Sequence, residues 1–317
     1  MSILNEDYQN KELEQYFDGS MQQGLGIDCD LDNHLRFKKG QFNLILGNDN
    51  VGKTFWLLWY FTILSIKQSL KWTIYCSENE VWSVKQKIMG FYLNKSLKLK
   101  YMEQKEFYMA KNWVDHYFKF VDTNKLYTVK ELLEVFEKSD TDGYLLDPYN
   151  SLAKEKGFNS HEYDYEMASM VRMFCRRTKK TIYISMHPVS DASRNKHTDG
   201  NFKGQQAPPL KSHAEGGQKW ANRCDDFLIL HRYFTDEMKS KTLLFVEKIK
   251  ETETGGDRTS FNNPLVFVFQ PYGFSLNGKN PLKMEVVFEK VENYNPRGGF
   301  ESVKLEEKIG RNEPAPF

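Results

Sequence analysis

The sequence predicts an α/β fold in which a mostly parallel sheet is covered by helices on both faces. From about residue 35 to residue 231, short apolar runs alternate with longer apolar or amphipathic runs. This alternation is typical of parallel strands joined by crossover helices. Further strand-like runs then follow with no helical run between them, which indicates an antiparallel extension of the sheet edge. With 317 residues, 40% of them hydrophobic, the chain can bury such a core.

The elements can be placed in order from the period of the apolar residues. An amphipathic helix is expected within residues 1–25, where Leu13, Tyr16, Phe17 and Met21 recur at roughly helical spacing. The expected strands lie in 41–47, 71–78, 118–123, 143–151, 181–188, 224–234, 242–250, 265–271 and 284–291. The expected helices lie in 53–68, 81–95, 129–139 and 162–180. The parts of the chain are then a helix within 1–25, an α/β domain over 26–292 and a tail over 293–317.

Charge and cysteine usage exclude several classes of protein. The net charge is +1, so any binding of a polyanion must come from local basic patches. No apolar run reaches the ~20 residues of a membrane span, and no signal peptide is evident. The cysteines form no C-x-x-C pair, so we expect neither a disulfide framework nor a zinc site, and we expect reduced thiols in a cytoplasm. These cysteines are Cys29, Cys76, Cys175 and Cys224.

Residues 47–54, GNDNVGKT, match the phosphate-binding pattern G-x-x-x-x-G-K-[ST] between an expected strand and an expected helix. Glycines let the backbone N–H groups point at phosphate oxygens, Lys53 reaches the β- and γ-phosphates, and the Thr54 hydroxyl completes a Mg²⁺ shell. The sequence therefore predicts binding of ATP, or another NTP or dNTP, with Mg²⁺. The expected nucleotide-binding residues here are Gly47, Asn48, Asp49, Asn50, Val51, Gly52, Lys53, Thr54 and Phe55.

Carboxylates follow two of the expected strands. Asp147 ends an apolar strand, where it would hold Mg²⁺ through water, although it could also cap a turn before Pro148. Glu78 and Glu80 both follow the strand after the phosphate-binding helix, and either could deprotonate an attacking water. We prefer Glu78 because it lies at the strand end; otherwise these glutamates are solvated acids at a helix start.

Four further positions carry polar side chains with alternative interpretations. His187 ends the strand after the Asp147 strand, where it would face the γ-phosphate and sense its loss, or else be structural. Lys248 and Lys250 alternate on one expected strand and so share a face. Supplied to a neighbouring subunit, such a cation is worth roughly 10³–10⁵ in rate, whereas the alternative is a solvated strand face. Arg232 could stack on a nucleotide base.

Together these motifs resemble the DnaB-type, superfamily 4 replicative helicases, and most closely the Twinkle and phage helicase–primase branch. The likeness runs from about Leu25 to about Phe274. GNDNVGKT is similar to the family's Walker A motif, IYCSENEVWSVKQKIM to the strand, glutamate and helix that carry the catalytic base, and YLLDPYNSL to Walker B. ISMHP is similar to the polar sensor, and EGGQKWANRCDDFLILHR to the segment that leads to the base-stacking arginine.

The stretch EKIKETETGG is similar to the family's paired cations, which reach across a subunit interface. It departs from the family because the finger position is usually arginine and here is Lys250. Lysine lacks the planar fork of arginine, so trans-activation could be weaker, or Arg258 could substitute.

The resemblance implies a RecA-like motor that forms a ring, usually a hexamer, around single-stranded DNA. Residues 1–25 would be the linker helix that docks on the adjacent subunit. Because little chain precedes residue 47, priming would fall to a separate primase, and a helicase loader is a further possible partner. The loops after Asp147 and from Val189 would line the channel. The candidate DNA contacts are Lys154, Lys156, Arg194, Lys196 and Lys203. Two alternatives are a recombinase filament and a nucleotide-gated scaffold or loader without motor activity.

Overall fold

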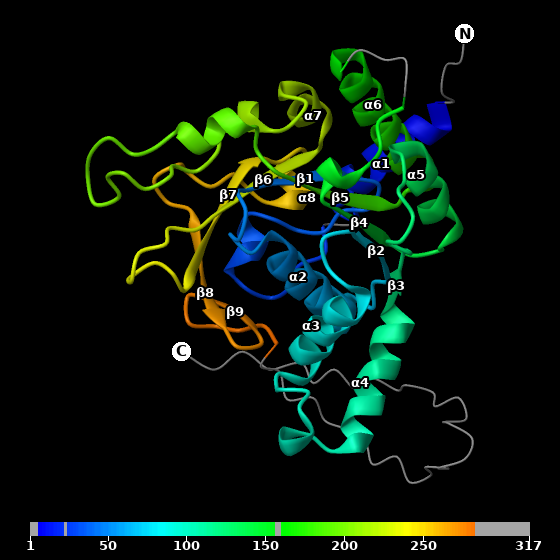
Figure 1. Ribbon diagram of the computed structural model, residues 1–317. Coiled ribbons are helices and arrows are strands. Elements are labelled where there is room, and N and C mark those ends of the chain that lie inside the picture. The colour runs from blue at the N-terminus through cyan, green and yellow to red at the C-terminus, as the bar shows by residue number, and fades with distance from the viewer. Residues whose placement is uncertain (1–5, 22–23, 156–159, 283–317) are drawn as a thin grey trace. The chain divides into compact units, whose positions relative to one another are not determined.

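In the part of the chain that the structure describes, nine strands form one sheet, in the order β3-β2-β4-β5-β1-β6-β7-β8-β9 (Figure 1). The computed structural model describes residues 6–21, 24–155 and 160–282. The strands are β1 (Phe42–Leu46), β2 (Trp72–Cys76), β3 (Phe118–Phe120), β4 (Gly143–Asp147), β5 (Thr181–Met186), β6 (Asp226–His231), β7 (Lys241–Lys248), β8 (Leu265–Gln270) and β9 (Gly273–Leu276).

The sheet is parallel from β3 to β6 and antiparallel from β6 to β9, which confirms the predicted fold class. Strand β1 pairs with β5 on one side and with β6 on the other. The chain leaves β1 for β2, which lies beyond β5 and β4. Consequently the segments that follow β2, β4, β5, β1 and β6 all emerge at one edge of the sheet, where such sheets bind ligands.

Each face of the sheet has its own core. One core contains buried side chains of α2 (Lys53–Gln68), α3 (Val81–Leu93) and α4 (Gln104–Tyr117). The other contains side chains of α5 (Val129–Lys138), α6 (Ser160–Thr178) and α7 (Gln218–Arg223). Helix α2 is apolar nearly all round because it is enclosed by the sheet, by neighbouring helices and by β9. This packing fixes the N-terminus of α2 against the sheet edge (Figure 1).

The structure departs from the expected elements in the C-terminal half and around α4. Helix α4 and strand β9 were not expected, and a short helix, α8 (Thr252–Gly255), interrupts the run of strands between β7 and β8. The expected strand at 284–291 and the expected tail lie outside the described residues. In the described ranges, no helix is long and apolar enough to cross a membrane.

The expected N-terminal helix is α1 (Glu6–Phe17). Its apolar side chains are poorly covered: Leu13 is 64% exposed, Tyr16 54% and Phe17 92%. The chain's own core therefore does not account for the amphipathic pattern of this helix.

Candidate active site

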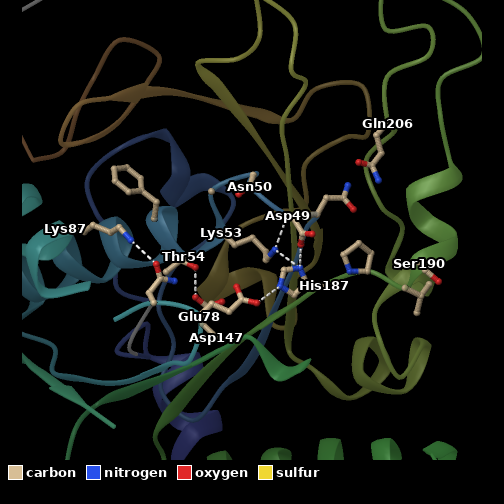
Figure 2. A pocket seen from close by; sticks show the side chains of 16 residues that line it. Asp49, Asn50, Lys53, Thr54, Glu78, Lys87, Asp147, His187, Ser190 and Gln206 are labelled. Carbon is tan, nitrogen blue, oxygen red and sulfur yellow. Dashed lines mark hydrogen bonds and ion pairs between the residues drawn. The ribbon is translucent and has the colours of Figure 1, made fainter. Parts of the chain in front are cut away.

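The segments that follow β1, β2, β4 and β5 enclose a pocket of 980 Å³ at the carboxyl edge of the parallel strands. Ten of the twenty sequence-predicted site residues meet there (Figure 2). The pocket is lined by Asn48, Asp49, Asn50, Gly52, Lys53, Thr54, Phe55, Glu78, Asn79, Lys87, Asp147, His187, Pro188, Val189, Ser190 and Gln206.

The loop between β1 and α2 has the form of a phosphate cradle. Gly52 has φ = 92°, a left-handed conformation that favours glycine, and it immediately precedes α2. At Gly47 a Cβ atom would lie 2.6 Å from the carbonyl oxygen of Leu230 on β6. Both glycines are therefore required by the geometry. The first residues of α2 line the pocket, and a helix N-terminus is a favourable place for an anion.

Lys53 is the first residue of α2 and is only 7% exposed. Its ammonium donates to the carbonyl oxygens of Gly47 (2.7 Å) and Asn48 (3.0 Å). Burial lowers the pKa of Lys53, and the carboxylates of Asp147, Asp49 and Glu78 oppose that effect. The ammonium of Lys53 is thus held in the loop by neutral carbonyl oxygens. Phosphate oxygens bound in the loop would give it a negatively charged partner.

Thr54 and Asp147 face each other from α2 and the end of β4. The Thr54 hydroxyl donates to Oδ2 of Asp147 at 2.5 Å, and Asp147 is buried. A hydroxyl and a carboxylate are the oxygen donors that Mg²⁺ takes in nucleotide sites, so the pair fits this metal. Among the described residues, no group of three His, Cys, Asp or Glu side chains is placed to hold a metal ion, so phosphate oxygens and water would complete the shell.

The structure distinguishes the two candidate glutamates. Glu78 lines the pocket just beyond β2, and its neighbour Ser77 is bound through its N–H to the carbonyl oxygen of Asp147 at 3.1 Å. Glu80 is the residue that precedes α3 and does not line the pocket. This placement supports Glu78 as the base.

His187 connects the phosphate loop to Glu78 (Figure 2). Its Nδ1 lies 2.7 Å from Oδ1 of Asp49 and 3.5 Å from Nζ of Lys53, and its Nε2 lies 3.5 Å from Oε1 of Glu78. The backbone N–H of His187 donates to the side-chain oxygen of Asn150 at 3.2 Å. A group in this position contacts both the cradle and the candidate base, as expected for a sensor of the γ-phosphate.

Arg232 follows β6 and lies beside the phosphate loop. A Cβ atom at Gly52 would lie 3.2 Å from Nη2 of Arg232. The guanidinium donates to the Thr242 hydroxyl at 2.6 Å and lies 6.0 Å from the ring centroid of Phe269. Its position next to the loop is compatible with the predicted contact to a nucleotide base.

Lys248 and Lys250 lie at the opposite ends of the strands from the pocket, near the start of β6. Strand β7 runs antiparallel to β6, and Lys248 pairs with Phe227 near the start of β6. The length of β6, roughly 17 Å at 3.3 Å per residue, therefore separates them from Arg232 and the pocket. The expectation that both lysines alternate on one strand is wrong, because β7 ends at Lys248 and Lys250 lies beyond it.

The candidate DNA-contacting residues lie on two loops outside the pocket. Lys154, Arg194, Lys196 and Lys203 are exposed, and Lys156 lies outside the described residues. The longer loop runs from β5 to α7 and is anchored where Phe202 stacks on Tyr233 with ring centroids 3.9 Å apart. This loop also contributes pocket-lining residues, namely Val189, Ser190 and Gln206.

Sequence reasoning missed several residues that the fold brings to the pocket. Asn79 and Lys87 form one group, in which the Lys87 ammonium donates to Oδ1 of Asn79 at 3.1 Å. The nine-residue spacing from Glu78 to Lys87 places the lysine two turns along α3, a signal that only a helix already positioned at the site could reveal. Gln206 comes from the long loop, and its place depends on tertiary packing alone.

Comparisons with known structures agree with this geometry. The chain is similar to the ATPase domain of G40P, with a TM-score of 0.66 and 11% identity, over 84% of this chain and 96% of that one. It is also similar to a DnaB-like replicative helicase that was solved to show its interactions with primase, with a TM-score of 0.64 and 11% identity, over 86% of this chain and 67% of that one. The fold is that of the ATPase domains of DnaB-like helicases. A KaiC-like protein of Pyrococcus horikoshii is more distant, with a TM-score of 0.52 and 12% identity over 80% of this chain and 97% of that one.

No protein-family model matches the chain. In sequence, the chain is 22% identical over 241 residues to a Twinkle homolog protein, chloroplastic/mitochondrial, of Arabidopsis thaliana. The match covers 70% of this chain but only 32% of that relative. The predicted resemblance to DnaB-type proteins is confirmed by these likenesses, and the fold is RecA-like.

Proposed function

We propose that the chain is an NTP-driven, ring-shaped DNA helicase that translocates on single-stranded DNA and unwinds duplex DNA during replication. One observation carries the proposal: Lys53, Thr54, Asp147, Glu78 and His187 come together in one pocket from four strand ends of a DnaB-like fold. These are the side chains that phosphoryl transfer to water requires, which are a phosphate cradle, metal ligands and a base.

In this proposal the phosphate loop and Lys53 hold the β- and γ-phosphates, and Thr54 and Asp147 hold Mg²⁺. Bound Mg²⁺ would neutralise charge on the phosphate oxygens. Glu78 accepts a proton from water as the water oxygen bonds to the γ-phosphorus. The bond from that phosphorus to the bridging oxygen breaks, which gives ADP and phosphate. His187 lies 3.5 Å from Glu78 and responds to the loss of the γ-phosphate. Its movement would be transmitted to β5 and to the loop that follows this strand.

The placement of the charges on two sides of the chain supports the proposed ring. Because Lys248 and Lys250 are a strand length from the chain's own pocket, the proposal assigns them to the pocket of another subunit. Head-to-tail contact of this kind generates a closed ring or a filament. The exposed apolar side chains of α1 support a docking role for residues 1–25 on the adjacent subunit.

The proposed path for single-stranded DNA lies along Lys154, Arg194, Lys196 and Lys203. Three of these residues are on the loop that also lines the pocket, so nucleotide state can alter the loop's position. A primase and a helicase loader are the proposed partners. The solved DnaB-like helicase with primase interactions supports the first of these.

A nucleotide-gated scaffold without motor activity is the second candidate. Its support is that both candidate finger lysines have partners within the chain. The Lys248 ammonium donates to the carbonyl oxygens of Ala221, Asn222 and Cys224, and Lys250 lies 3.4 Å from Asp225. A scaffold would bind nucleotide and DNA but would not couple DNA binding to turnover.

Steady-state ATP hydrolysis, with and without single-stranded DNA, separates these functions. We expect DNA to stimulate turnover, and we expect Lys53→Ala to reduce the stimulated rate by about 10²–10³-fold because a charged partner of the transition state is lost. Lys105→Ala, an exposed lysine on α4, is the matched control and should be neutral. A basal rate that DNA does not change would favour the scaffold.

The oligomer should depend on α1. Each apolar side chain buried at an interface contributes roughly 1.5–3 kcal/mol. The double change Leu13→Ser and Phe17→Ser should therefore weaken subunit association at least about a hundredfold, as read by mass photometry across a dilution series. Glu14→Ser, an exposed polar change on the same helix, is the control. Equal oligomer size for all these proteins would refute the docking role.

A further inference from the structure

A buried ion pair holds the backbone of Lys250. Lys38, in the segment before β1, is 7% exposed, and Asp226, the first residue of β6, is fully buried. The Lys38 ammonium lies 3.0 Å from Oδ1 of Asp226 and donates to the carbonyl oxygen of Lys250 at 2.8 Å. The same carboxylate oxygen accepts the backbone N–H of Lys250 at 3.2 Å. The two charged side chains thus bind both backbone polar groups of one residue, Lys250.

These bonds replace a strand ladder. Lys250 lies beyond the end of β7, so its N–H and carbonyl groups have no ladder partner on β6. Buried backbone groups without partners are costly, and here side chains from two other segments supply them. The turn that follows packs on the pair as well, because a Cβ atom at Gly255 would lie 2.4 Å from Nζ of Lys38.

The side chain of Lys250 is held separately. Its ammonium lies 3.4 Å from Oδ1 of Asp225, which is 2% exposed, while the Lys250 side chain is 41% exposed. The other oxygen of Asp225 accepts the N–H of Phe42 at 2.9 Å and pairs with Arg172. Asp225 therefore keeps partners if Lys250 leaves it, so the ammonium can move to a stronger anion while its backbone stays fixed.

We infer that Lys38 and Asp226 are positioning residues for Lys250, which set its main chain so that the ammonium reaches the nucleotide of an adjacent subunit. The inference rests on the proposed function. A buried ion pair is a poor source of stability, since apolar replacements are often neutral, so its presence at this segment calls for a geometric role. Placement matters more for lysine than for arginine, because lysine is a point charge on a flexible stem. A misplacement of about 1 Å at a reacting group can cost about 10²-fold.

The test is a mutant cycle in the full chain, with kcat and KM for DNA-stimulated ATP hydrolysis, affinity for fluorescent ADP, and melting temperature as readouts. Lys38→Met is made in the wild-type and Lys250→Ala backgrounds. In the wild-type background we expect kcat to fall at least about tenfold, with KM and ADP affinity changed less than about twofold, since the chain's own pocket is untouched. In the Lys250→Ala background Lys38→Met should cause no further loss of kcat.

Three more variants keep the test informative if Lys38→Met folds poorly: a double change, Gly255→Ala and Lys38→Arg. The double change Lys38→Met and Asp226→Asn removes both charges and leaves no buried charge unpaired. Gly255→Ala leaves both charges in place and displaces the ammonium. Both should show the same selective fall in kcat, and Lys38→Arg should retain part of the rate.

The outcomes distinguish failure of the inference from failure of the proposed function. Equal losses of kcat in both backgrounds, or an unchanged kcat in folded Lys38→Met, would overturn the positioning role while the motor stands. If Lys250→Ala alone leaves the stimulated rate unchanged, the motor again stands and the positioning role falls. Absence of DNA-stimulated hydrolysis in the wild type would remove both.

Discussion

Glu78→Gln is expected to lower DNA-stimulated ATP hydrolysis by about 10²–10⁴-fold, the range for loss of a general base. Glutamine keeps the size of the side chain but cannot accept the proton of the attacking water. Glu80→Gln, two residues away, should change the rate by less than about threefold, because Glu80 precedes α3 and lies outside the pocket lining. The two variants form a matched pair, each losing one charge from the same loop.

Nucleotide binding must be measured beside the rate. Glu78 does not belong to the phosphate loop, so Glu78→Gln should bind fluorescent ADP as the wild type does. A loss of rate with retained binding identifies chemistry as the affected step. A strong loss in Glu80→Gln together with near-normal turnover in Glu78→Gln would reverse the assignment of the base.

The parts of the fold that the sequence predicted are those set by local patterns. The apolar runs at β1, β2, β4 and β5 are long enough to mark buried strands, and the order of strands and helices followed from them. Helix α4 was missed because only Ala110, Trp113, Val114 and Tyr117 are buried on an otherwise polar helix. Strand β9 was missed because it is four residues long and begins at a glycine.

The site residues likewise divide into those that local patterns predict and those that depend on tertiary packing. The residues of the phosphate loop, Asp147 and His187 were predictable because each sits at a fixed offset from a strand end, and parallel strands end at one edge. The sequence only favoured Glu78 over Glu80, since the full distinction depends on where α3 begins relative to the pocket. Gln206 could not be predicted, because a loop of this length has no pattern that fixes where it folds back.

The two candidate finger lysines show most clearly what could not be predicted from the sequence. Sequence alternation treated Lys248 and Lys250 as equivalent neighbours on one strand. In the structure, the Lys248 ammonium binds three carbonyl oxygens around the C-terminus of α7, where a cation is favourable, and it supports that helix end. Lys250 lies past the strand end with a partly exposed ammonium. The end of β7 thus makes Lys250 the better candidate for an interface role.

Two inactive variants should restore activity when mixed. Lys250→Ala is expected to reduce stimulated hydrolysis by up to about 10³-fold, the lower end for a finger acting in trans, because lysine lacks the guanidinium fork. Lys53→Ala removes the cradle of the chain's own pocket. In mixed rings, a Lys250→Ala subunit supplies an intact pocket and an adjacent Lys53→Ala subunit supplies an intact Lys250.

At equal concentrations about a quarter of the interfaces should then be complete, by random head-to-tail assembly of two kinds of subunit. The measurement is the hydrolysis rate against the mixing ratio, which should rise from near zero at either end to a maximum near equal amounts. A chain whose one change is Lys105→Ala, mixed with Lys53→Ala, gives the reference curve for dilution alone.

If the two pure variants are inactive and no mixture regains activity, Lys250 acts within its own subunit or only in folding. A distance of a strand length between Lys250 and its own pocket leaves the first of these without a geometric basis. Rescue would therefore place the catalytic unit at the interface and make each pocket dependent on the presence of a neighbour.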